Sequence, residues 1–138
     1  MELNRKEIVE ILCQPELARI ATVSKDCKPH VTPVWFLYEN GIVYMTTGKN
    51  SVKVRNLRNN PHIAITIDIT ERGLNNRGVI LTGKAEIETD DEIAKKIFLK
   101  YLGSLDHPSA KKLLEMPRVV IKLKPEKIIS WDFREKSE

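Results

Sequence analysis

The residues best suited to binding a ligand lie between positions 41 and 61, in the stretch GIVYMTTGKNSVKVRNLRNNP. An apolar run typical of a strand leads through two threonines to Ser51, a residue type that often caps the start of a helix. The stretch contains four cations: Lys49, Lys53, Arg55 and Arg58. No Asp or Glu occurs from Asn40 to Ile67. Because free N–H groups at a helix start favour an anion, this pattern predicts a phosphate-binding site.

The distribution of charge narrows the class of ligand. The 138 residues include 23 Lys and Arg and 19 Asp and Glu, which gives a net charge of +4. The four cations of the 41–61 stretch equal this excess, so the positive charge is concentrated in one place. A nucleic-acid binder more often spreads its basic residues over a wide face. We therefore expect a small anionic ligand and no nucleic acid, with a solvated basic helix as the plain alternative.

The composition predicts one cytoplasmic, globular domain over residues 1–138. Hydrophobic residues make up 41% and charged residues 30% of the sequence. No apolar run approaches the about 18 residues of a membrane span, and the N-terminal sequence MELNRKEIVEIL is too charged for a signal peptide. Cys13, Cys27 and the scattered histidines match no metal-ligand spacing. We therefore expect neither a membrane segment nor a metal site.

Alternating hydrophobicity predicts a mainly β domain, an antiparallel barrel with peripheral helices. Strands are expected at residues 17–23, 30–38, 42–47, 62–68, 79–88, 118–124 and 128–133, and helices at residues 4–13, 51–59, 89–102 and 110–114. Two capping-box patterns, Asn4-x-x-Glu7 and Thr89-x-x-Glu92, mark helix starts. An Asn-Gly turn predicts that the second and third strands pair in antiparallel fashion. Residues 70–78 are expected to form a polar loop.

A proline followed by aromatic residues forms a second candidate region. Pro33 cannot donate to a strand ladder and is typical of an edge or a bulge, so its strand could offer backbone groups to a planar heterocycle. Trp35 and Phe36 point to opposite faces, and we expect a second subunit or a ligand to cover one of them. The plain alternative is an edge strand with core aromatics. No acid–base cluster is evident, and Arg19 is expected to pair with an acid such as Asp68.

Two segments of the sequence carry a family resemblance: LARIATVSKDCKPHVTPVWF and IVYMTTGKNSVKVRNLRNNPHIAITID. From about residue 17 to residue 88, the chain resembles the pyridoxamine 5′-phosphate oxidase-like flavoproteins, the FMN-binding split-barrel family. The hydroxyl-rich strand end, the Ser-x-Lys pair and the Arg-Asn-Leu-x-x-Asn-Pro run occur in the family's order and spacing. The resemblance implies a six-stranded antiparallel split barrel, a homodimer, and one FMN in each of two clefts between subunits.

The resemblance also implies which residues bind the cofactor. The residues expected at the FMN phosphate are Ser51 and Lys53, assisted by Thr46 or Thr47 and by Arg55. The residues expected to line the isoalloxazine ring are Thr32, Pro33, Val34, Tyr44 and Met45. Arg77 matches a basic position before the family's fifth strand, and Trp131 matches an aromatic residue near the C-terminus. Spacing alone favours a core role for Trp131, so its interpretation as a stacking residue rests on the resemblance.

Two departures from the family's pattern bear on the substrate. Gly78 stands where pyridoxamine 5′-phosphate oxidase itself has a glutamine that touches the flavin. The C-terminal Arg-x-His substrate clamp of that enzyme is absent, because this sequence reads Trp131-Asp132-Phe133-Arg134 there. We therefore expect an FMN-dependent oxidoreductase that acts on a small substrate other than pyridoxamine phosphate. The alternatives are an F420-dependent reductase of the same fold and a flavin-binding carrier, store or sensor without turnover.

Overall fold

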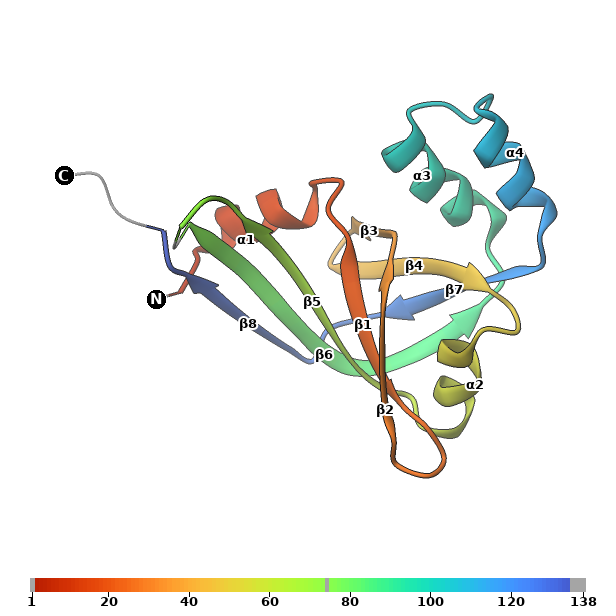
Figure 1. Cartoon of the computed structure of the whole chain (residues 1–138), viewed down its shortest axis with the longest axis horizontal. Helices are drawn as coiled ribbons and strands as arrows, with labels where there is room; N and C mark the ends of the chain where they lie inside the picture. Colours follow the sequence, from red (N-terminus) through yellow and green to blue (C-terminus); the bar gives the residue numbers. More distant parts are fainter. Residues whose placement is uncertain (1, 74, 135–138) are drawn as a thin grey trace.

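An antiparallel β-sheet forms the body of the protein (Figure 1), and the computed structural model describes residues 2–73 and 75–134. The strands are β1 (Ala18–Val23), β2 (Pro29–Val34), β3 (Phe36–Glu39), β4 (Ile42–Gly48), β5 (His62–Thr70), β6 (Asn76–Glu88), β7 (Arg118–Leu123) and β8 (Lys127–Asp132). The helices are α1 (Arg5–Leu12), α2 (Val52–Asn59), α3 (Asp91–Leu102) and α4 (Pro108–Glu115). The predicted mainly β fold with peripheral helices is confirmed.

The strands follow the order β2-β1-β5-β6-β7-β4-β3, and β8 adds to the side of β6. The 13-residue β6 joins the two halves of the sheet, because its first part pairs with β5 and β8 and its last part, from Ala85, pairs with β7. The predicted antiparallel pairing of the strands around the Asn-Gly turn is confirmed by β3 and β4. The two end strands of this order, β2 and β3, follow one another in the chain, and no ladder between described residues closes the sheet.

Residues 2–73 and 75–134 form eight strands rather than the six implied by the resemblance, partly because the predicted strand at residues 30–38 is divided. β2 ends one residue before Trp35 and pairs with β1, whereas β3 begins one residue after it and pairs with β4. Helix α3 satisfies the backbone of Phe36 at this break. The Phe36 N–H donates to the Tyr101 hydroxyl at 3.2 Å, and Lys100 Nζ donates to the Phe36 carbonyl at 2.9 Å. The prediction of one continuous strand is therefore wrong.

Helix α3 also covers one ring of the aromatic pair at the break. Phe36 is fully buried in the main core. Trp35 belongs to a separate cluster, where it stacks on Tyr101 with 4.8 Å between the ring centroids and 5° between the planes. The burial that comes with this packing raises the pKa of Tyr101 to about 12 and lowers the pKa of Lys100 to about 8. The two rings lie apart as predicted, and Trp35 stays only partly buried beside α3. Its cover by a second subunit or a ligand remains a prediction.

Other element boundaries also differ from those expected. β5 and β6 extend into both ends of the predicted loop at residues 70–78, because Thr70 pairs with Asn76, and only residues 71–75 lie between the two strands. Asp90, rather than Thr89, caps α3 by accepting a hydrogen bond from the backbone three residues later. α4 is longer than the predicted helix at 110–114. The capping box at the start of α1 and the cap at the start of α2 are confirmed.

Two hydrophobic clusters hold the elements together. The larger one lies within the sheet and against α1, with Ile11, Ile20 and Ile65 among its fully buried members. The smaller one lies under α3. The ion pair expected for Arg19 is confirmed, since its Nη1 lies 2.9 Å from Asp68 Oδ1. Within residues 2–73 and 75–134, no helix has both the length and the apolar character needed to cross a membrane.

A buried hydrogen bond fixes α2 against the sheet. Asn56 Nδ2 donates to Thr22 Oγ1 at 3.0 Å, and the two residues are only 5% and 1% exposed. Replacing Asn56 with leucine will lower the free energy of unfolding by about 1–3 kcal/mol, because the buried Thr22 hydroxyl loses its partner. Urea denaturation measures this loss. The double variant Asn56→Leu/Thr22→Val will be more stable than Asn56→Leu alone, and equal stability of the single variant and the wild type would contradict the assignment.

Candidate functional site

The cavity that gathers several of the residues predicted to bind the cofactor, which we call the main cavity, is lined by residues at the ends of β2 and β4, near the start of α2, on α3 and α4 and at the start of β7. Its volume is about 380 Å³. Its apolar wall includes Pro33, Val34, Trp35, Phe98 and Leu113, and its polar wall includes Thr46, Thr47, Lys53 and Arg118. None of the described residues that line it is an Asp or a Glu. A positive end beside an apolar wall suits an anionic ligand with a flat, apolar body.

Several residues predicted to bind the cofactor meet at this cavity, namely Pro33, Val34, Thr46, Thr47 and Lys53. Lys53 is the most informative of them. Its side chain is half-buried, burial lowers its pKa, and no described carboxylate forms an ion pair with it. A partly desolvated ammonium group is stabilised by an anion placed beside it, so this position favours a negatively charged ligand group.

A second, smaller cavity of about 190 Å³ lies at the same helix start. Its lining carries three cations: Lys49, Arg55 and Arg58. Ser51, the N-cap of α2, also lines it, because residues four positions apart, such as Ser51 and Arg55, lie on the same side of a helix. Lys53 and Arg55 are two residues apart and therefore about 200° apart around the helix, so they serve different cavities. The sequence suggests one basic cluster, whereas the structure divides it between two neighbouring cavities.

The cap of α2 lies between the two cavities. Ser51 Oγ accepts a hydrogen bond from the Val54 N–H at 3.4 Å, and Thr47 Oγ1 lies 3.5 Å from Ser51 Oγ. Thr47 lines the larger cavity and Ser51 the smaller one. The first backbone N–H groups of α2 therefore start at the junction of the two cavities, where the helix dipole adds positive character.

Arg118 is a cation of the main cavity that the sequence analysis missed. It is the first residue of β7 and pairs in register with Gly48, the last residue of β4. Its Nε donates to the Leu113 carbonyl at 3.1 Å, and its guanidinium carbon lies 5.0 Å from the centre of the Phe98 ring. No local motif marks Arg118, since only the pairing of β7 with β4 brings it to the hydroxyl-rich strand end.

The neighbouring threonines have different roles at this end of the cavity. The Thr46 hydroxyl donates to the Val119 carbonyl at 3.2 Å and accepts a hydrogen bond from Arg118 Nη1 at 3.1 Å. Its proton is therefore already engaged. Among the described residues, Thr47 makes only a long hydrogen bond, in which its hydroxyl donates to Ser51 Oγ at 3.5 Å, so this hydroxyl can turn to a ligand more readily than that of Thr46. Of the two threonines that the resemblance left open, the geometry favours Thr47 as the ligand contact and Thr46 as the support for Arg118.

Three residues predicted at the isoalloxazine ring lie outside the lining of the main cavity. Met45 is fully buried in the main core, and Tyr44 packs against the cluster beneath α3. Thr32 lies on β2 next to Pro33, and its Oγ1 is buried without a hydrogen-bond partner among the described residues. Because buried hydroxyl groups are normally paired, Thr32 is an orphaned polar group on the strand that borders the cavity.

Arg77 and Trp131 lie in another part of the molecule. β8, which carries Trp131, is on the side of the sheet away from α2, α3 and α4 (Figure 1). Trp131 pairs in register with Gly78 and donates from Nε1 to Asn76 Oδ1. Arg77 Nη1 lies 3.9 Å from Glu71 Oε1. The chain folds so that neither Arg77 nor Trp131 lines the main cavity.

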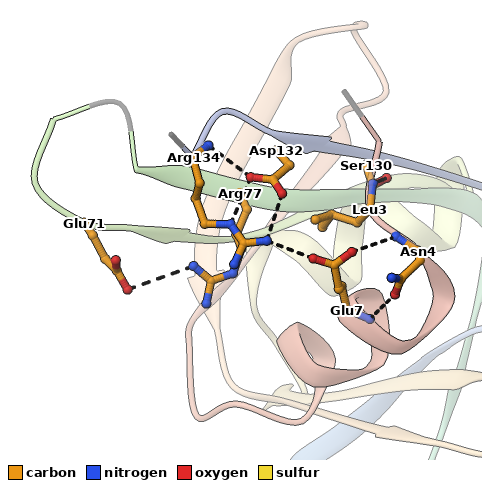
Figure 2. A network of polar contacts seen from close by, with 8 residues as sticks. All are labelled: Leu3, Asn4, Glu7, Glu71, Arg77, Ser130, Asp132 and Arg134. Carbon is orange, nitrogen blue, oxygen red and sulfur yellow. Dashed lines mark hydrogen bonds and ion pairs between the residues drawn. The ribbon is translucent and has the colours of Figure 1, made fainter. Parts of the chain in front are cut away.

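A polar network near Arg77 ties the two ends of the described chain together (Figure 2). Arg134 Nη2 lies 2.8 Å from both Asp132 Oδ2 and Glu7 Oε2. Its hydrogen bond to Asp132 lowers the pKa of that carboxyl to about 2. The Leu3 N–H donates to the Ser130 hydroxyl at 2.9 Å. The residues that replace an Arg-x-His sequence near the C-terminus are thus partly used to anchor α1 to the end of β8.

Comparison with known proteins identifies the family to which this chain is similar. A family model described as pyridoxamine 5′-phosphate oxidase matches residues 5–132. General stress protein 26 of Bacillus subtilis (strain 168) is 25% identical over 137 residues, which cover 96% of this chain and 91% of that protein.

Two solved structures are similar over most of their length. A conserved hypothetical protein of Mycobacterium tuberculosis has a TM-score of 0.83 and 24% identity, over 96% of this chain and 86% of that one. A protein described as an F420 reductase has a TM-score of 0.71 and 28% identity, over 86% of this chain and 93% of that one. The split-barrel type of fold implied by the sequence resemblance is thereby confirmed. Because the family model spans nearly the whole chain, this protein belongs to the pyridoxamine 5′-phosphate oxidase family.

Proposed function

We propose that this protein is an FMN-dependent oxidoreductase that holds the cofactor in the main cavity and at the start of α2. The observation that carries the proposal is Lys53, a half-buried cation without an acidic partner among the described residues, beside a cavity of about 380 Å³. A phosphate there accepts hydrogen bonds from Lys53, from the Thr47 and Ser51 hydroxyls and from the first N–H groups of α2. Arg55 adds positive charge from the smaller cavity.

The residues around the apolar end fit a flat ring. Pro33 and Val34 come from the end of β2, and Trp35 and Phe98 add aromatic surface. The Thr32 hydroxyl on the same strand, which has no hydrogen-bond partner among the described residues, is a polar group that a heterocycle edge can satisfy. These residues support a cofactor with a phosphate at one end and an aromatic ring system at the other.

In this arrangement the cofactor and the protein chain have different roles. A bound flavin supplies the electron-transfer chemistry. The chain binds the phosphate through Lys53 and Ser51, orients the ring against β2, and excludes water with the apolar side chains of Leu17, Phe98 and Leu113. Gly78 replaces the glutamine expected for pyridoxamine 5′-phosphate oxidase itself, and Arg134 is held by Asp132 and Glu7. For these reasons we place the substrate among small molecules other than pyridoxamine phosphate.

A deazaflavin cofactor is the alternative with its own support. The solved structure described as an F420 reductase is 28% identical to this chain and covers 86% of it. The phosphate of F420 would use the same helix start and the same cation, Lys53. The two cofactors therefore differ in the ring presented to β2 and in the groups beyond the phosphate, and direct titration separates them.

We also propose that the protein acts as a homodimer. Arg77 and Trp131 are expected at the cofactor from the family resemblance but do not line the main cavity of their own chain. A second copy could supply them to the same cofactor. β8 and its end carry exposed apolar side chains that a partner would cover: Ile128 and Ile129 are each 44% exposed and Phe133 is 58% exposed.

Spectroscopy and titration test the proposed function directly. The purified protein, titrated with FMN, riboflavin and F420 and followed by absorbance and fluorescence, will bind FMN with one equivalent per chain. Light scattering in the same samples will give twice the mass of one 15.9 kDa chain. Preferred binding of F420 would favour the deazaflavin alternative, and binding of neither cofactor would overturn the proposal. Bound FMN that is neither reduced nor reoxidised with broad panels of donors and acceptors would indicate a carrier or sensor.

A further inference from the structure

We propose that Arg118 is an oxyanion-binding residue of the main cavity, and that the cavity accepts a phosphate or carboxylate group beside β7 as well as at the start of α2. This proposal deepens the proposed function and rests on it only where the oxyanion belongs to the cofactor. Arg118 lines the same cavity as Lys53, although the two residues come from different elements, β7 and α2.

The guanidinium is held in one orientation. Its Nε donates to the Leu113 carbonyl at the end of α4, and its Nη1 donates to Thr46 Oγ1 in β4. The Thr46 hydroxyl can accept because it directs its own proton to the Val119 carbonyl. The Phe98 ring lies within 5.0 Å of the guanidinium carbon. Contacts with α3, α4 and β4 therefore hold the planar guanidinium of Arg118 in place before a ligand binds.

Most of the hydrogen-bonding capacity of Arg118 is still available. A guanidinium has five N–H groups, and the contacts with Leu113 and Thr46 use two of them. No described carboxylate forms an ion pair with Arg118, and burial lowers its pKa. A planar fork that is rigid, partly desolvated and without a counter-ion matches a carboxylate or a phosphate, which accept two parallel hydrogen bonds.

A purely structural role explains less of the geometry. Arg118 does join α4 to the end of β4, and a residue with only that task could direct its remaining N–H groups to bulk solvent. Instead the side chain is half-buried and lines a cavity whose other cation, Lys53, also lacks an acidic partner among the described residues. The apolar wall of the same cavity adds contact surface for the body of a ligand that carries the oxyanion.

The test compares charged and neutral ligands of matched shape in the wild type and in Arg118→Gln. The difference in affinity between FMN and riboflavin reports on the binding of the cofactor phosphate. The difference in affinity between benzoate and benzamide reports on the acid group of a second ligand. It is measured with the FMN-loaded and with the ligand-free protein. Trp35 lines the cavity and provides a fluorescence signal that needs no flavin. Arg118→Gln will weaken FMN or benzoate by about tenfold or more, while the affinity for the matched neutral ligand stays nearly constant.

Three further variants make the result specific. Arg72→Gln removes an equal charge from an exposed position and will leave all affinities unchanged. Thr46→Val removes the acceptor that orients the guanidinium and will give a smaller, charge-selective loss. Arg118→Lys keeps the charge but not the fork, will show the same selective loss, and replaces Arg118→Gln if that variant fails to fold.

The ligand pair whose charged member loses affinity in Arg118→Gln identifies the source of the oxyanion. If Arg118→Gln weakens only FMN binding, Arg118 binds the cofactor phosphate. If it weakens only benzoate binding, Arg118 binds an acidic second ligand. Equal effects on charged and neutral ligands in both arms, in a folded variant, would overturn the proposal. If the wild type binds no flavin, the proposed function fails by itself, and benzoate binding to the ligand-free protein still decides the role of Arg118.

Discussion

Replacing Lys53 with alanine will weaken FMN binding by about 10- to 100-fold, because a hydrogen bond to a charged group contributes about 1.5–3 kcal/mol. Riboflavin lacks the phosphate, so its affinity will change little. The loss is expected to be large because the Lys53 side chain is half-buried and has no ion pair with a described carboxylate that could take over its charge. Flavin fluorescence titrations of both ligands against both proteins measure the difference.

Two control variants test whether the loss of FMN affinity is specific to Lys53. Lys111→Ala removes the same charge from an exposed position on α4 and will leave both affinities unchanged. Arg55→Ala removes a cation from the smaller cavity and will have a weaker effect than Lys53→Ala, because Arg55 faces away from the main cavity. A loss of riboflavin affinity equal to the loss of FMN affinity would show that Lys53 supports the cavity and does not bind the phosphate.

Replacing Gly78 with alanine will destabilise the protein by about 2–3 kcal/mol, because the new methyl group has no space. A Cβ atom at this position would lie 2.5 Å from Trp131 Cζ2 and 2.8 Å from the Ile67 carbonyl oxygen. The Trp131 ring is anchored by its hydrogen bond to Asn76, and the Ile67 carbonyl belongs to the backbone of β5, so neither yields easily. Urea or guanidinium denaturation followed by circular dichroism measures the change.

Gly48 offers a matched control for this substitution. A Cβ atom there would meet nothing within 4 Å, so Gly48→Ala will change the free energy of unfolding far less. Adding Trp131→Ala to Gly78→Ala will cost less than the same tryptophan change in the wild type, since it removes the main clash. Equal stabilities of Gly78→Ala and Gly48→Ala would contradict this interpretation.

The contact between Gly78 and Trp131 gives a physical account of a departure seen in the sequence. A glutamine is expected at position 78 from the resemblance to pyridoxamine 5′-phosphate oxidase itself. In this chain the Trp131 ring occupies the space that any side chain at position 78 would enter. The two positions are therefore coupled, and the change at Gly78 is understood only once β8 is seen to pair with β6.

Much of the local structure could be predicted because its causes are local. Alternating apolar residues placed most strands, and Ser51 marked the start of α2 because its side chain accepts from a helix N–H. The absence of acids around Lys53 and Arg55 pointed to an anion site. The family motifs lie mostly within one continuous segment, residues 17–88, so the resemblance could also be stated from the sequence.

The tertiary structure decided how these parts meet. Periodicity favours one strand over residues 30–38, and only the contacts of Phe36 with α3 stabilise the break at Trp35. Arg118 is 72 residues from Thr46 in the chain, and the pairing of β7 with β4 brings their side chains together. Hydrophobic periodicity specifies which face of an element is buried but not which distant element covers it. The site therefore depends on long-range pairing, which placed Lys53 and Arg118 in one cavity and Trp131 in another part of the molecule.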